Sequence, residues 1–263
     1  MRYYVIDAFT DKAFSGNPAA VCLLDNPIPD ESMASIAREM NLSETAFALR
    51  EEDAWRLRWF TPAVEVPLCG HGTLATARAL REAGLVSGRN VRFRSLSGDL
   101  AAHYREGWIE LDFPSLPPVP APLPDNFLEA LNIDVMPRWT GVNAHRYWLI
   151  DMGSAALVRT LSPDRTATMA LNVPGIIVTG PGETPYDFTS RFFAPADGIF
   201  EDPVTGSAHA ALTPYWASIL DKMEFLAYQA SARCGILKVR LNGNRVCIAG
   251  QTVVIASGAL QIT

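Results

Sequence analysis

Two short blocks of the sequence place polar side chains where a glycine-led segment begins. They are Cys69-Gly70-His71-Gly72-Thr73 and Thr205-Gly206-Ser207, and each precedes a run of small and apolar residues that predicts a buried helix. The first turn of a helix presents N–H groups without partners inside the helix, and its dipole favours an anion. Two such helix starts predict a paired site for a carboxylate or a developing enolate oxygen. In the simpler alternative, Gly70 and Gly206 only permit tight turns.

Glu44 is the carboxylate whose position suits acid/base chemistry. It lies between the end of one predicted helix and an apolar strand at residues 46–49, so its side chain can reach the edge of a dry cleft. A carboxyl group in such a place can take a proton from carbon and return it, as a one-base isomerisation requires. The alternative is an exposed glutamate at a helix exit.

Three further polar residues lie at the two helix starts. His71 stands one residue into the first helix, where the dipole disfavours its protonated form, so we expect a neutral imidazole that hydrogen-bonds to substrate, or else a structural histidine. Asp202 could orient an amino or hydroxyl group of a ligand, or only cap the second helix. Ser207 is the counterpart of His71 and could offer a hydroxyl, although serine is ordinary at this position.

The sequence predicts neither a metal nor a cofactor. Its four cysteines, Cys22, Cys69, Cys234 and Cys247, form no CxxC pair, and there is no GxGxxG or GxxxxGK[ST] loop. The other histidines, His103, His145 and His209, have no acidic residues at ligand spacing. A two-thiol mechanism would need a cysteine before each helix-starting glycine, and Thr205 holds the second position. We therefore interpret Cys69 as a small buried residue.

Composition indicates a globular protein that acts on small molecules. The chain has 263 residues, 49% of them hydrophobic, and a formal net charge of −6 with scattered basic residues. Such a chain can bury a large core and has no electrostatic footprint for nucleic acid or an anionic membrane. The first residues lack a cationic stretch followed by an apolar run, which predicts no secretory signal and a cytoplasmic location. No apolar run is long enough to predict a membrane span.

The elements that must position these residues occur twice. Arg58-Trp59-Phe60-Thr61-Pro62-Ala63 corresponds to Arg191-Phe192-Phe193-Ala194-Pro195-Ala196, and residues 65–71 correspond to residues 201–207. The prolines of residues 114–124 exclude a helix or a central strand. We place the boundary there, with a first half at 1–115 and a second half at 116–263 whose last strand could return to the first.

Runs of β-branched and aromatic residues predict strands on both sides of this boundary. Asp30 predicts the cap of a helix that ends near Asn41. The predicted strands are residues 3–9, 19–24, 45–49, 56–60, 91–95, 100–104, 108–113, 147–150, 175–179, 187–193, 236–241, 245–249 and 253–256.

Four motifs together resemble the PhzF family, the phenazine-biosynthesis-like proteins. They are Asp7-Ala8-Phe9-Thr10 with Gly16-Asn17-Pro18, Ser43-Glu44-Thr45-Ala46-Phe47, Cys69-Gly70-His71-Gly72-Thr73, and Glu201-Asp202-Pro203-Val204-Thr205-Gly206-Ser207. The resemblance extends from the first residues to about Leu220. It implies an α+β fold of the diaminopimelate-epimerase type, with two pseudo-symmetric halves, each a β-barrel around a central helix, and an active site between them.

The resemblance also implies roles for individual residues. The family's acid/base glutamate falls on Glu44, its histidine on His71, and its aspartate and serine on Asp202 and Ser207. The substrate- or anion-binding positions are then Gly70, Gly72, Thr73 and Gly206, with glycine at 72 where the family usually has alanine or proline.

The function implied is a cofactor-independent isomerase or epimerase that moves a proton within a small, anionic, carboxylate-bearing metabolite, in a homodimer. Two alternatives stay open. One is a member of the fold that binds a metabolite or a protein and has lost catalysis, and the other is a cysteine-dependent racemase or dehydratase.

Overall fold

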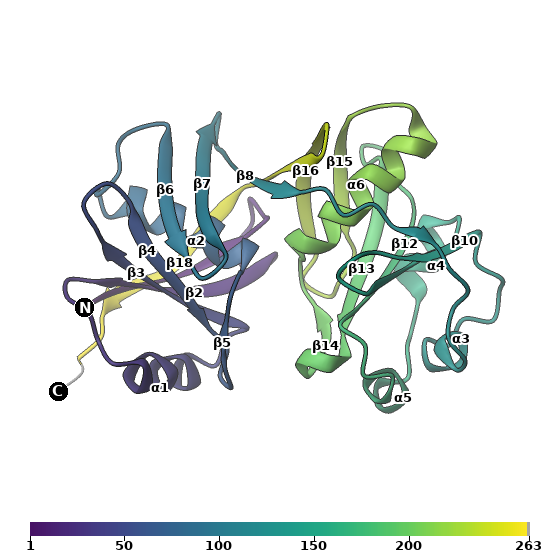
Figure 1. Cartoon of the computed structure of the whole chain (residues 1–263), viewed down its shortest axis with the longest axis horizontal. Helices are drawn as coiled ribbons and strands as arrows, with labels where there is room; N and C mark the ends of the chain where they lie inside the picture. Colours follow the sequence, from purple (N-terminus) through teal and green to yellow (C-terminus); the bar gives the residue numbers. More distant parts are fainter. Residues whose placement is uncertain (262–263) are drawn as a thin grey trace. The chain divides into compact units, whose positions relative to one another are not determined.

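The computed structural model describes residues 1–261, which form two compact units. The first unit consists of Met1–Asp112 together with residues 249–261, and the second unit is Phe113–Ile248. Both units are built of strands and helices in mixed order, so the predicted α+β class is confirmed (Figure 1).

The first unit is a run of strands interrupted by two helices. Its elements are β1 (Arg2–Ala8), β2 (Asn17–Leu24), α1 (Asp30–Met40), β3 (Glu44–Arg50), β4 (Trp55–Phe60), β5 (Glu65–Val66), α2 (Gly70–Glu82), β6 (Asn90–Ser95), β7 (Gly98–Arg105), β8 (Trp108–Pro114) and β18 (Thr252–Ala259). The chain's last strand, β18, pairs with β1 in antiparallel register. The strands predicted for this part of the sequence all lie at observed strands.

Helix α2 is the central helix of the first unit, and it packs against β1, β2, β3, β7 and β18. Residues 71–77 are all buried, and small side chains such as Ala75 and Ala77 let the strands approach closely. Helix α1 covers the opposite face of β3, where Phe47 packs with Met33 and Ile36. Because side chains alternate along a strand, Glu44 and Ala46 lie on the α2 face of β3, while Phe47 lies on the α1 face.

The second unit also has a long helix, α6, together with three short helices. Its elements are β9 (Val119–Pro120), α3 (Phe127–Ala130), β10 (Trp139–Val142), β11 (Tyr147–Asp151), α4 (Ala155–Thr160), α5 (Arg165–Ala170), β12 (Gly175–Pro181), β13 (Phe188–Ala194), a 3₁₀ turn η1 (Pro195–Asp197), β14 (Ile199–Asp202), α6 (Gly206–Leu220), β15 (Glu224–Gln229), β16 (Gly235–Asn242) and β17 (Arg245–Gly250). The sequence patterns did not predict β10, β15 or the short helices α4 and α5.

Strand pairing confirms the internal repeat at the level of topology. In the first unit β2 is parallel to β3, β3 antiparallel to β4, β4 parallel to β6, and β6 antiparallel to β7. In the second unit the same sequence of parallel and antiparallel pairs joins β11, β12, β13, β15 and β16. Helices α2 and α6 follow the equivalent strands β5 and β14, so both predicted glycine-led helices exist.

An ion pair repeated in both units holds this strand–turn–helix segment. Arg58 binds Glu65 through two bonds of 2.7 Å, and Arg191 binds Glu201 through bonds of 2.6 and 2.9 Å. Each guanidinium also lies over the phenylalanine two residues further along its strand, at 5.1 Å from the Phe60 ring and 5.3 Å from the Phe193 ring. The arginine and glutamate of the repeat are therefore structural, because a planar fork is needed to bind a carboxylate twice.

Pro214 lies inside α6 without ending the helix. A proline cannot donate to the carbonyl four residues earlier, which leaves the Ala210 oxygen without its helical partner. The N–H of Leu116 donates to that oxygen at 2.9 Å. The helix thus tolerates the proline because a residue of the proline-rich segment replaces the missing donor.

The N-cap of α1 differs from the prediction. Asp30 was expected to cap this helix, but Pro29 is the N-cap, and the Asp30 carboxylate instead accepts a hydrogen bond of 2.6 Å from Arg58.

Among residues 1–261, no helix has both the length and the hydropathy that crossing a membrane requires.

Candidate functional site

Glu44 and His71 form a buried acid–imidazole pair in the first unit. Glu44 is the first residue of β3, His71 is the second residue of α2, and Glu44 Oε2 lies 3.0 Å from His71 Nε2. The two side chains are 13% and 8% exposed. Within the described chain, this carboxylate oxygen makes no hydrogen bond of good geometry, although it lies close to the imidazole.

Cys69 completes this cluster as the N-cap of α2. Its Sγ accepts the Gly72 N–H at 3.3 Å and lies 3.5 Å from His71 Nδ1. Burial raises the pKa of the Cys69 thiol, and the Glu44 charge adds to the rise. The side chain is buried, as expected, but it also has a capping role that the sequence did not predict.

The pKa of His71 shifts in the direction opposite to the one that the helix dipole alone would give. Burial lowers the pKa of His71, but the Cys69 and Glu44 groups raise it more, so the pKa lies well above its ordinary value. Cys69 acts in this way only as a thiolate, and its thiol keeps its proton at neutral pH because of burial. Glu44, with its carboxylate oxygen 3.0 Å from the ring, also favours the charged imidazole and so acts against the helix dipole.

Asn17 and Ser43 extend the cluster, and the sequence did not identify either as a site residue. The Asn17 amide nitrogen lies 3.3 Å from His71 Nδ1, and Ser43 Oγ donates to the Asn17 amide oxygen at 3.4 Å. Asn17 is fully buried. It reaches His71 because β2 and β3 are parallel, with Ala19 opposite Glu44. The Gly16-Asn17-Pro18 motif was the only signal that could have found it.

Gly72 and Thr73 have internal partners. The Thr73 hydroxyl donates to the Cys69 carbonyl at 2.6 Å, and Gly72 donates to Cys69 Sγ. A Cβ at position 72 would meet the indole of Trp59 at 2.8 Å, so glycine is required there while Trp59 occupies that space. That Gly70, Gly72 and Thr73 bind an anion stays a prediction.

The second unit brings its predicted residues together around the start of α6. The Thr205 hydroxyl donates to the Asp202 carboxylate, and the Thr205 N–H donates to Gln229 Oε1 at 2.9 Å. Gln229 in turn donates to the Asp202 carbonyl at 2.9 Å. The turn before Gly206 is thus held by hydroxyl and amide groups, whereas the turn before Gly70 has a thiol.

Ser207 has a partner that the sequence did not predict. The Tyr147 hydroxyl hydrogen-bonds to Ser207, and burial raises the pKa of Tyr147. His209 lies one turn into α6, fully buried, with its Nδ1 donating to the Thr205 carbonyl at 2.8 Å. In the first unit, Thr73 likewise donates to the carbonyl of the residue before the helix-starting glycine, Cys69. His209 is therefore a structural residue.

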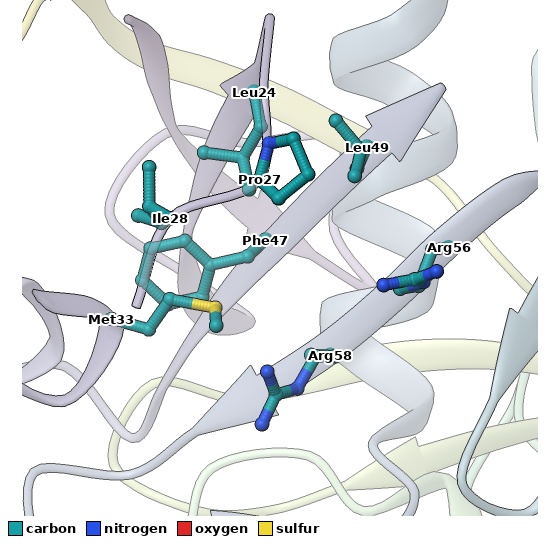
Figure 2. A pocket seen from close by; sticks show the side chains of 8 residues that line it. All are labelled: Leu24, Pro27, Ile28, Met33, Phe47, Leu49, Arg56 and Arg58. Carbon is teal, nitrogen blue, oxygen red and sulfur yellow. The ribbon is translucent and has the colours of Figure 1, made fainter. Parts of the chain in front are cut away.

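A cluster of possible metal ligands and a small hollow are further features of the first unit. The ligand atoms of Glu44, Cys69 and His71 lie within 4.8 Å of one another and are of types that bind thiophilic divalent ions. Figure 2 shows a small hollow between α1 and the strands β3 and β4. Its volume of about 40 Å³ is far below the several hundred Å³ that a metabolite needs. It is lined by Leu24, Pro27, Ile28, Met33, Phe47, Leu49, Arg56 and Arg58.

Comparison with known proteins finds similar chains of nearly the same length. A protein of Halalkalibacterium halodurans named an uncharacterized isomerase is 48% identical over 260 residues, which cover 98% of this chain and 97% of that protein. The crystal structure of a PhzF-family phenazine biosynthesis protein from Enterococcus faecalis has a TM-score of 0.94 at 40% identity, over 99% of both chains.

A hydroxyproline epimerase from Agrobacterium vitis shares the fold, with a TM-score of 0.64 at 12% identity over 98% of this chain and 91% of that chain. This confirms the epimerase-like fold expected from the sequence. The high identity to a full-length isomerase identifies the chain as an enzyme of the isomerase class. Residues 6–258 match the family described as phenazine biosynthesis-like protein, and the chain belongs to this PhzF family.

Proposed function

We propose that this isomerase transfers a proton within a small carboxylate-bearing metabolite, with Glu44 as its acid/base and no cofactor. One observation carries the proposal. The Glu44 carboxylate, on the first residue of β3, is nearly buried, with one oxygen 3.0 Å from the imidazole of His71 at the start of α2 and without a well-aligned hydrogen bond. Such a group can accept a proton from substrate carbon and return it elsewhere.

The neighbouring groups have complementary tasks in this mechanism. His71 Nε2 faces the carboxylate and stabilises its charged form when substrate carbon is protonated. The first-turn N–H groups of α2, beginning at Gly70, would hold the negative charge of a substrate carboxylate or enolate. In the second unit, Asp202, Gly206 and Ser207 at the start of α6 are proposed to bind polar groups of a ligand.

Hydrogen exchange tests the role of Glu44. The enzyme is incubated in D₂O with amino acids, hydroxy acids and aromatic carboxylates, and deuterium in the recovered ligand is measured by mass spectrometry. Glu44→Gln should reduce incorporation at least about a hundredfold, because general acid/base catalysis contributes that much or more. Glu39→Gln is the matched control, since Glu39 is exposed on α1, and it should exchange like the wild type. Exchange by Glu44→Gln at the wild-type rate would contradict the proposal.

Two further experiments distinguish the proposed reaction from a cysteine-dependent reaction and from a metal-dependent one. A cysteine-dependent reaction requires Cys69, whereas the proposed one should survive Cys69→Ser, because a serine oxygen can still accept the Gly72 N–H. Treatment with a chelator should leave exchange unchanged. Loss of exchange in metal-free enzyme, restored by zinc, would instead make Glu44, Cys69 and His71 a metal site.

A further inference from the structure

The hydrogen bonds around His71 form a directed chain. Ser43 Oγ donates to the Asn17 amide oxygen at 3.4 Å, so the amide nitrogen is turned toward His71 Nδ1, 3.3 Å away. An amide nitrogen can only donate, which makes Nδ1 the acceptor of this bond, and the Cys69 thiol, 3.5 Å from the same nitrogen, can also donate to it. The remaining ring proton then lies on Nε2, 3.0 Å from the Glu44 carboxylate.

We propose that Asn17 is a positioning residue that fixes the tautomer of His71, with Ser43 fixing the direction of the Asn17 amide. The role rests on the proposed function, since it matters for catalysis only if Glu44 moves the substrate proton. Its consequence is specific: in the neutral ring, the nitrogen that lies 3.0 Å from the acid/base carboxylate carries the proton and not a lone pair. A ring with the opposite tautomer would place two acceptors 3.0 Å apart and would raise the energy of the ionised Glu44.

Asn17 also disfavours the addition of a second proton to the His71 ring, at Nδ1. An imidazolium carries hydrogens on both nitrogens, so an N–H on Nδ1 would meet the amide N–H of Asn17. The amide would have to rotate so that its oxygen accepts from the ring, and Ser43 would have to turn from donor to acceptor. The titratable groups acting on His71 are Cys69 on the turn before α2 and Glu44 on β3, and both favour the imidazolium when charged. Asn17 opposes them without carrying charge.

The same chain contains the reverse arrangement as a reference. Asn90 and His103 lie on the paired strands β6 and β7, with the Asn90 amide oxygen 2.8 Å from His103 Nδ1. His209 Nδ1 faces the Thr205 carbonyl. Both rings therefore have a proton on Nδ1, whereas His71 has its neutral proton on Nε2.

The test is nitrogen-15 NMR of the histidine rings in the full-length, ligand-free protein, recorded across pH. The chain has four histidines, and the His71 signals are assigned by their absence from His71→Gln. We expect neutral His71 to be protonated on Nε2, opposite to His209. Asn17→Asp places a carboxylate acceptor beside Nδ1, so the imidazolium form of His71 should persist to a pH that is higher by about 1 to 3 units than in the wild type. Asn90→Asp is the matched control, which should change His103 and leave His71 as in the wild type.

Ser43→Ala is the second variant, and it decides the matter if Asn17→Asp does not fold. Loss of the Ser43 hydroxyl removes the donor to the Asn17 amide oxygen, so a second tautomer of His71 should appear. A proton on Nδ1 of neutral wild-type His71, or an unchanged single tautomer in Ser43→Ala, would overturn the assignment. The outcome is separate from that of the exchange assay, because it needs no substrate. If His71 has the expected tautomer but the enzyme incorporates no deuterium into any carboxylate ligand, the proposed function is refuted and the role of Asn17 is not.

Discussion

Replacement of Gly72 by alanine should destabilise the first unit, although alanine is normally the better helix residue. An added Cβ would lie 2.8 Å from Trp59 Cδ1, 3.0 Å from Trp59 Nε1 and 3.0 Å from Cys69 Sγ. Comfortable contact between carbon atoms needs about 3.5 to 4.0 Å, so the indole or the helix must move by close to 1 Å. Trp59 is 1% exposed and cannot swing into solvent.

The expected magnitude follows from two opposing contributions. Overpacking a rigid core costs about 1 to 3 kcal/mol, whereas the helix propensity of alanine returns up to about 1 kcal/mol. We expect a net loss of about 1 to 2 kcal/mol in the free energy of unfolding. Trp59→Phe should relieve it, since the smaller ring vacates the space of the new methyl group. In the second copy of the repeat, the counterparts of Trp59 and Gly72 are Phe192 and Ala208, the same pair of residue types as in the double variant.

A double-mutant cycle measured by urea unfolding tests this reasoning. Gly72→Ala and Trp59→Phe should each be destabilising, and the double variant should be more stable than their sum by about 1 kcal/mol or more. Gly88→Ala is the control, because its nearest neighbour would lie 3.9 Å away and no clash arises. Additive effects of the two changes, or a Gly72→Ala protein as stable as the wild type, would refute the packing argument.

Three other outcomes are expected. Burial lowers the pKa of His209 to about 4, below its value near 6.5 in an unfolded chain. The neutral ring therefore contributes fully to stability above pH 6.5, and the free energy of unfolding should fall by up to about 3 kcal/mol as the pH drops toward 4. The His209→Phe variant should lack this pH dependence of its unfolding free energy. Arg191→Lys should cost more unfolding free energy than Arg58→Lys, because the Arg191 side chain is 10% exposed and that of Arg58 22%; equal losses would contradict this. Cys69 should react with a thiol reagent only after urea unfolding, and mass spectrometry that finds it modified in the native protein would show the turn to be open.

The duplicated segment could be predicted from the sequence because its residues are adjacent along the chain. The motif from Arg58 to His71 contains a strand, a turn and a helix start, so local patterns sufficed to locate α2 and its counterpart α6. Glu44 and His71 were selected one by one, and their contact at 3.0 Å depends on how β3 packs against α2.

The supporting residues could not be found in this way. Asn17 reaches His71 through a parallel register between strands, and the Leu116 N–H replaces a helical donor for Ala210 from a distant segment. Both bonds join residues far apart in the sequence, and neither residue type indicates its partner. The expectation of a neutral His71 considered the helix dipole alone, whereas the fold also places Cys69 and Glu44 beside the ring, and both groups raise the pKa of His71.

Comparison of the two units supports a reaction with a single base. Arg58 pairs with Phe47 across β4 and β3, and its counterpart Arg191 pairs with Val178 across β13 and β12, so the position equivalent to Glu44 is Gly175. A Cβ at Gly175 would meet the Tyr147 ring at 2.6 Å, so the aromatic side chain fills the space where a second acid would lie. The Tyr147 hydroxyl then binds Ser207, the counterpart of His71. The repeat has kept its ion pair and its helix start while replacing acid and imidazole by phenol and hydroxyl. A glutamate at 175 would have to displace that ring, and the first unit therefore holds the only acid–imidazole pair at a repeated helix start in the described chain.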